Sequence, residues 1–188
     1  RVDVFNGREL VETVRPWQPE PGSRRIRILW EGALYRGRFR QVIWDGGASL
    51  ADNAVRDARP INFFNPDNRL LRPGPAELAW KALTTGNIGG VDIWLEEAAA
   101  GTLSIRTPLV DVAIPVARID TTPMVFDRSA ALSRTLSVQR LPERLDETTC
   151  AATLPVTLRA EGDNPLFIRV TQEDGTLAWT SPIYVFRG

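Results

Sequence analysis

The sequence of 188 residues contains no histidine, one cysteine and one methionine. Histidine is the commonest metal ligand and the usual general base near neutral pH. Its absence excludes histidine-containing metal sites and catalysis by Ser-His-Asp or Cys-His groups. The single cysteine, Cys150, cannot form an internal disulfide or build a metal cluster alone. We therefore expect no metal, no cofactor and no catalytic centre in this chain.

The sequence also lacks an excess of charge of either sign, because 23 basic residues balance 23 acidic ones. No net field favours nucleic acid or an anionic membrane surface. No run approaches 18 consecutive apolar residues, and no leader pattern is visible. We expect neither nucleic acid nor membrane as a partner, and the cytoplasm is the favoured compartment. The only methionine is Met124, so Arg1 is not an initiator position, and we expect a processed chain or, in preference, a piece of a longer protein.

Apolar and polar residues alternate with a period of two through most of the chain, which predicts strands. Asn6-Gly7 predicts a type I′ hairpin turn, and Asp45-Gly46-Gly47 and Glu173-Asp174-Gly175 predict further turns. We therefore expect an all-β fold, an antiparallel β-sandwich formed by residues 1–188 as a single domain. The later strand-like runs include Leu78–Thr84, Val91–Leu95, Thr102–Thr107, Leu132–Arg140, Thr153–Arg159, Leu166–Gln172 and Leu177–Phe186.

Helices are expected to be few and short. The two candidates are Trp94–Ala100, which Gly101 would end, and Phe126–Leu136, which alternates acceptably as a strand as well. The same alternation predicts the residues that two packed sheets bury. These are Ile28, Trp30, Trp44, Ile93, Ile168, Val170 and Trp179.

Three arginines spaced by two, Arg36, Arg38 and Arg40, point to one face of an expected strand. They could form an anion-binding ladder. The chain has no net positive charge to support such a role, so a solvated face with ion pairs is the favoured interpretation.

Exposed aromatic residues are expected in two places. The segment Asn62-Phe63-Phe64-Asn65-Pro66-Asp67-Asn68 contains adjacent phenylalanines, which cannot both face inward on a regular strand. We interpret it as a turn with one surface aromatic residue, although Asp67 and its neighbours could also bind calcium. Trp17, between Pro16 and Pro19, is the tryptophan expected to be free of the core.

Three separated segments carry a family resemblance: Tyr35–Gln41 running to Gly46, Arg59–Pro66, and Arg169–Gly175 running to Tyr184. Together they resemble the C-terminal portion of a bacterial domain-of-unknown-function family related to the PHP (polymerase and histidinol phosphatase) metal-dependent phosphoesterases. The resemblance covers nearly all 188 residues, and the final Trp-Thr-Ser-Pro-Ile-Tyr strand is its most telling part. It implies a parent hydrolase whose histidine- and aspartate-rich metal site lies in an N-terminal α/β part. No such ligand can be carried over, because this chain has no histidine.

These observations predict a non-catalytic accessory domain that packs against its own N-terminal domain or a second subunit of a metal-dependent, hydrolase-like protein. The alternative is a β-sandwich module that binds carbohydrate or another ligand. A third interpretation is an enzyme that uses paired carboxylates, but the spacing of Asp and Glu in the sequence does not indicate such a pair. The predicted interface comprises Trp17, Asn62, Phe63, Phe64, Asn65 and Asp67, rimmed by Arg36, Arg38 and Arg40.

Overall fold

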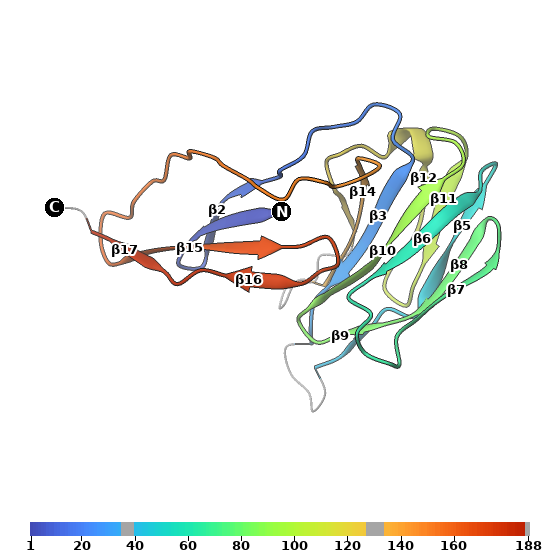
Figure 1. The fold of residues 1–188 in the computed structure, drawn as a ribbon. Helices are drawn as coiled ribbons and strands as arrows, with labels where there is room; N and C mark the ends of the chain where they lie inside the picture. Colours follow the sequence, from blue (N-terminus) through green and yellow to red (C-terminus); the bar gives the residue numbers. More distant parts are fainter. Residues whose placement is uncertain (35–39, 127–133, 187–188) are drawn as a thin grey trace. The chain divides into compact units, whose positions relative to one another are not determined.

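The computed structural model describes residues 1–34, 40–126 and 134–186 (Figure 1). Strands account for 51 % of the described residues, whose strand pairs are all antiparallel, and no helix among these residues reaches seven residues. The only helical element in the described ranges is a single 3₁₀ turn, Val116–Arg118. The predicted all-β, antiparallel fold is therefore confirmed. Among these residues no helix is long and apolar enough to cross a membrane.

The chain divides into two compact units, whereas the sequence analysis drew one domain across residues 1–188. Unit 1 combines the two ends of the chain, residues 1–18 and 145–188. Unit 2 is the continuous stretch 19–144. Each unit is described by itself.

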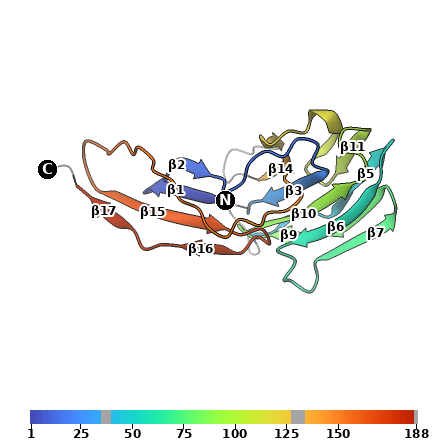
Figure 2. The same ribbon diagram turned by 45° about the horizontal axis from the view of Figure 1, so that its top comes forward.

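Unit 2 is a sandwich of two five-stranded sheets with a small third sheet (Figure 2). The first sheet has the order β13 (Met124–Phe126), β14 (Thr135–Leu141), β3 (Arg25–Glu31), β10 (Ile88–Leu95) and β6 (Val55–Ile61). The second has the order β12 (Asp111–Pro115), β11 (Thr102–Arg106), β5 (Gly46–Ala51), β8 (Glu77–Lys81) and β7 (Arg69–Gly74). The pair β4 (Val42–Ile43) and β9 (Leu83–Thr84) forms the third.

Tryptophans join the two large sheets of unit 2. Trp30 of β3 stacks on Trp80 of β8, with 5.1 Å between ring centroids and 21° between ring planes. The Trp80 indole N–H donates to the carbonyl of Trp44 at 2.7 Å, and the Trp44 indole donates to Thr84 Oγ1 at 2.9 Å. Trp44 and Trp80 are therefore buried with both of their indole N–H groups hydrogen-bonded.

The alternation of side chains along each strand determines which other residues enter this core. Ile26, Ile28 and Trp30 of β3 point inward and are fully buried, as is Ile93 of β10. The predicted core positions Ile28, Trp30, Trp44 and Ile93 are therefore confirmed. Trp30 lies so close to β10 that a Cβ at Gly89 would meet its Nε1 at 2.7 Å, which explains why glycine occupies that position.

Unit 1 is a single sheet of five strands. β16 (Leu177–Trp179), β15 (Asn164–Thr171), β1 (Val2–Asn6) and β2 (Glu9–Val14) follow one another, and β17 (Ile183–Val185) also pairs with β15. No second sheet packs on it among the described residues of unit 1. For this reason the predicted burial of Ile168, Val170 and Trp179 is wrong: they are 38 %, 37 % and 59 % exposed.

The predicted turns have mixed outcomes. The hairpin β1–β2 forms, but its two turn residues are Gly7 and Arg8, and only Gly7 has a positive φ, 61°. That is the type II′ pattern, not type I′. The turn at Glu173-Asp174-Gly175 joins β15 to β16 as predicted.

The hairpin predicted at Asp45-Gly46-Gly47 is wrong, because β4 and β5 pair with other strands. The glycines instead allow close packing. A Cβ at Gly46 would lie 2.1 Å from the Arg106 carbonyl oxygen.

Two further expectations are wrong. Trp94 and Leu95 end β10, and no helix follows them through residue 100, because pairing with β3 and β6 extends the strand. Thr153–Arg159 alternates like a strand but pairs with none, and residues 142–163 contain no regular element. In Figure 2 this orange segment runs past β1 and β15. In the ambiguous stretch Phe126–Leu136, β13 ends at Phe126 and β14 begins at Thr135, while residues 127–133 lie outside the described ranges.

Candidate functional site

One face of the unit 1 sheet is lined by aromatic side chains. Directly opposed residues of antiparallel strands point to the same side, and the register pairs Phe5 with Phe167. Trp179 and Tyr184 pair with the residues two positions to either side of Phe167, so they share its face. The rings of Phe5 and Phe167 stack 4.9 Å apart, while Trp179 is 59 % and Tyr184 54 % exposed. We call the surface formed by these four residues the aromatic face.

A buried carboxylate lies beside these rings. Asp3 accepts hydrogen bonds from Arg169 Nη2 at 2.8 Å, from Thr13 Oγ1 at 2.8 Å and from Arg1 Nε at 3.1 Å. Burial opposes ionisation, but the Arg169 and Arg1 charges and the hydrogen bonds outweigh it, so the pKa of Asp3 is below its ordinary value. The carboxylate holds the Arg169 guanidinium 5.1 Å from the centre of the Phe5 ring, so N–H donors border the aromatic face.

The opposite side of the sheet is aliphatic. The register pairs Val2 with Val170, Val4 with Ile168, and Leu166 with Ile183. Ile183 is 70 % exposed, and Ile168 and Val170 are also open to solvent. β1 and β15 contribute no charged side chain to this side. We call the surface formed by Val2, Val4, Ile168, Val170 and Ile183 the aliphatic face.

One end of the aliphatic face is tied to the irregular segment 142–163. The Asn6 amide donates to Asn164 Oδ1 at 2.9 Å, and both side chains are buried. The backbone N–H of Arg159 donates to the same Oδ1 at 2.8 Å, and its guanidinium donates to the Asn6 carbonyl at 2.7 Å. These bonds fasten the segment near the hairpin and leave Ile168, Val170 and Ile183 exposed.

The adjacent phenylalanines of the predicted interface lie in unit 2 and face different ways. Phe63 packs on the core, with its ring centroid 6.3 Å from that of Trp30. Phe64 is 71 % exposed. The expectation that only one of them turns inward is confirmed. Whether Phe64 contacts a partner stays a prediction.

The polar residues around them form a turn. Asn62 has φ of 57° and donates from Nδ2 to the Ile88 carbonyl at 2.5 Å. The Asn65 side chain accepts from the Asp67 backbone N–H at 2.9 Å, an Asx turn, and Asp67 is exposed. The sequence interpretation of this segment as a turn is confirmed.

Of the remaining predicted interface residues, Trp17 belongs to unit 1 and Arg40 to unit 2. Trp17 is half-buried and not the most exposed tryptophan. Arg36 and Arg38 lie outside the described residues. Arg40 is exposed, but its φ is 48° and it precedes β4 instead of lying in a strand. The predicted place of Arg40 in an arginine ladder on a strand is therefore wrong, because such a ladder requires extended backbone at each arginine.

Unit 2 also contains a buried ion cluster that the sequence analysis missed. Asp92 accepts from Arg25 at 2.5 Å and from two nitrogens of Arg27 at 2.7 Å. The guanidinium groups of Arg25 and Arg59 each lie 4.9 Å from the centre of the Trp94 ring. The Arg25 side chain is 1 % exposed. Alternation placed Arg25 and Arg27 opposite the core, which ordinarily means solvent, and nothing local indicated Asp92 as their partner.

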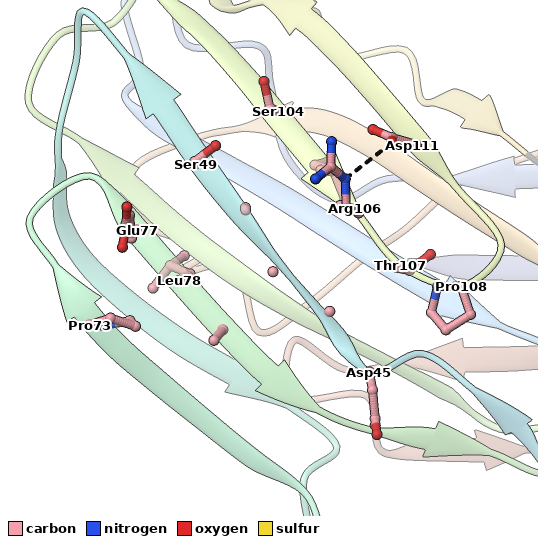
Figure 3. A pocket seen from close by; sticks show the side chains of 15 residues that line it. Asp45, Ser49, Pro73, Glu77, Leu78, Ser104, Arg106, Thr107, Pro108 and Asp111 are labelled. Atoms are coloured by element: carbon pink, nitrogen blue, oxygen red, sulfur yellow. Dashed lines mark hydrogen bonds and ion pairs between the residues drawn. The ribbon is translucent and has the colours of Figure 1, made fainter.

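A shallow hollow of about 620 Å³ lies over β5, β8 and β11 (Figure 3). Small residues such as Gly47, Ser49 and Ser104 form part of its lining. At its border Arg106 and Asp111 form an ion pair at 3.1 Å, with both side chains mostly exposed. The hollow is an open stretch of sheet surface, and no cluster of titratable groups converges on it.

In ranges 1–34, 40–126 and 134–186, no group of three or more His, Cys, Asp or Glu residues has the geometry to hold a metal ion. Cys150 is exposed.

The sequence analysis missed Trp179 and Tyr184 as surface residues. Both belong to a run that alternates as a buried strand would. A signal was present in Pro182, which cannot donate to a ladder and occurs mainly at edge strands and bulges. The β15 register shifts by one residue between β16 and β17 around this proline.

No family model, curated protein or solved structure significantly matches this chain.

Proposed function

We propose that this chain is a non-catalytic accessory module that packs the aliphatic face of unit 1 against another domain of a larger protein. The observation that carries this proposal is exposure. Three of the twelve large apolar side chains exposed in the described residues, Ile168, Val170 and Ile183, lie together on this face. Contiguous exposed apolar surface marks interaction sites, because water solvates it unfavourably.

The chemistry of the aliphatic face favours a protein as its occupant. Ile168, Val170 and Ile183 offer neither hydrogen bonds nor planar rings, so they gain only by being covered with other apolar groups. Full burial of one such side chain contributes about 1.5–3 kcal/mol, and partial exposure leaves a part of this to be gained. Several neighbouring side chains together can therefore hold a domain contact.

The partner is expected to cover the face and not to add a strand. Glu9 and Glu12 lie on the edge strand β2, and the register with β1 shifts between Val4 and Phe5. Charged side chains and bulges on edge strands discourage pairing with another chain. The exposed loop at Phe64 remains a predicted second contact.

The PHP resemblance suggests what the larger protein is: a hydrolase with its metal site in another domain. On this proposal the chain alone binds no transition metal stoichiometrically and hydrolyses no phosphoester. Metal analysis that finds about one tightly bound zinc, iron or manganese per chain would contradict it.

The docking surface is tested by hydrogen exchange. Amides of β15 and β17 should exchange more slowly in the product of the complete reading frame than in this chain alone. Ile168→Ser with Ile183→Ser should remove that extra protection, whereas Leu71→Ser, at a 58 % exposed position of unit 2, should not. Equal exchange in the two proteins would refute the proposal. Sedimentation showing that the chain itself dimerises through these residues would replace the partner domain with a second copy.

A further inference from the structure

We propose that the aromatic face of unit 1 is a second binding surface, which takes a neutral saccharide by stacking sugar rings on Trp179 and Tyr184. This inference concerns the side of the sheet opposite the aliphatic face and does not depend on the docking proposed above. It rests on the juxtaposition of exposed aromatic rings from β16 and β17 with a guanidinium of β15 that a buried carboxylate of β1 holds in place.

The geometry provides two accessible ring positions on one edge of the sheet. Trp179 pairs with Arg169 and Tyr184 with Pro165, which lie four residues apart on β15. At about 3.3 Å per residue the two positions are roughly 13 Å apart, a span suited to an oligosaccharide and not to a single sugar. Both rings are more than half exposed, so each can receive a ligand without the sheet unfolding.

The polar border complements sugar hydroxyls. A pyranose ring presents C–H groups on its flat faces and hydroxyls around its rim. The aromatic face offers rings for the former. Along the same face the partly exposed Arg169 supplies N–H donors, and the oxygen of the Thr13 hydroxyl, which donates its hydrogen to Asp3, can still accept. The ion pair with buried Asp3 fixes Arg169, so little side-chain freedom is lost when a ligand binds.

Charge separates a neutral saccharide from polyanions. Aromatic residues also stack on nucleic-acid bases, but binding to nucleic acid depends on neutralising phosphates. Unit 1 contains six arginines and no lysine against nine aspartates and glutamates, a formal charge of −3. This charge disfavours nucleic acids and acidic glycans alike.

The full chain should be titrated by calorimetry with neutral hexasaccharides of glucose, xylose and N-acetylglucosamine in their common linkages, and with an acidic oligogalacturonate. At least one neutral probe should bind saturably. Trp179→Ala should weaken that binding roughly tenfold or more, and Tyr184→Ala should weaken it as well. Phe64→Ala, which removes an exposed aromatic residue of unit 2, should leave binding unchanged. Calorimetry is preferred to fluorescence because Trp179→Ala removes the reporting indole.

Three results would overturn the proposal. The first is no saturable binding of any neutral probe, and the second is binding that survives both Trp179→Ala and Tyr184→Ala. The third is self-association of the chain that Trp179→Ala abolishes, because the aromatic face would then be a protein contact. Ile168→Ser with Ile183→Ser should leave saccharide binding intact, so failure at the aliphatic face and failure here are distinguishable. Unchanged circular dichroism of each variant shows that the fold is retained.

Discussion

Replacing Asp92 with asparagine would leave the buried arginine cluster of unit 2 without its negative charge. The carboxylate receives hydrogen bonds from Arg25 and Arg27, and its side chain is 4 % exposed. Asparagine has the same shape, but it keeps only one acceptor oxygen and turns an N–H₂ group toward guanidinium donors. The substitution therefore removes charge and adds donor–donor contacts without creating a cavity.

The expected loss follows from burial. Arg25 has a side chain only 1 % exposed, so its guanidinium cannot recover hydration when the partner charge is removed. Removing one member of a buried ion pair destabilises proteins by about 3–5 kcal/mol. A domain is stabilised by about 5–15 kcal/mol in total, so Asp92→Asn should lose a large fraction of the unfolding free energy of unit 2.

A matched control separates burial from ion pairing as such. Asp111 pairs with Arg106 at 3.1 Å, but the two side chains are 67 % and 81 % exposed. Exposed pairs contribute about 0–1 kcal/mol, so Asp111→Asn should change stability little. Urea unfolding followed by tryptophan fluorescence measures both, because Trp30, Trp44 and Trp80 are buried in unit 2. If both variants lose the same small amount, the argument from burial is refuted.

Two further predictions follow from unit 1 and from the Phe63–Phe64 turn. Because the pKa of Asp3 is lowered in the folded chain, its charge stabilises unit 1 above the unfolded value of 3.8, and this contribution is lost as the pH falls below it. Urea midpoints from the amide NMR signals of β1 should therefore differ between wild type and Asp3→Asn well above pH 3.8 and converge well below it. A difference independent of pH would count against the ionic role. Phe63→Ala removes a ring packed on Trp30 and should cost about 2 kcal/mol or more, whereas Phe64→Ala should stay within about 0.5 kcal/mol, as urea midpoints would show. Equal losses would mean that Phe64 is packed as well.

The sequence was sufficient for most of the strands and for much of one core, although Thr153–Arg159 alternates like a strand and pairs with none. Alternation is a local property of a strand, so Ile28, Trp30 and Ile93 could be assigned to a buried side without knowing their neighbours. Glycine-containing turns likewise located the ends of the β1–β2 and β15–β16 hairpins. The exact turn type was less accessible, because it depends on where pairing stops: Asn6 pairs with Glu9, which leaves Gly7 and Arg8 as the turn.

Alternation identifies which side chains share a face, but it does not say whether another layer covers that face. Ile28 of β3 and Ile168 of β15 belong to similar patterns, yet the first is fully buried and the second is 38 % exposed. The difference arises because a second sheet packs on β3 within unit 2, while unit 1 is one sheet. The aromatic and aliphatic faces are open because no second sheet packs on them among the described residues of unit 1.

Contacts between distant residues were decided only by the tertiary structure. Pairing of β1 with β15 brings Asp3 to Arg169, 166 positions away, and pairing of β3 with β10 brings Arg27 to Asp92. In the sequence Asp3 and Asp92 are ordinary carboxylates, and Arg27 and Arg169 are ordinary arginines that would be expected to face solvent. Local periodicity is encoded within a few residues and could be read directly, whereas the partner of a charge and the cover of a sheet face depend on which strands meet.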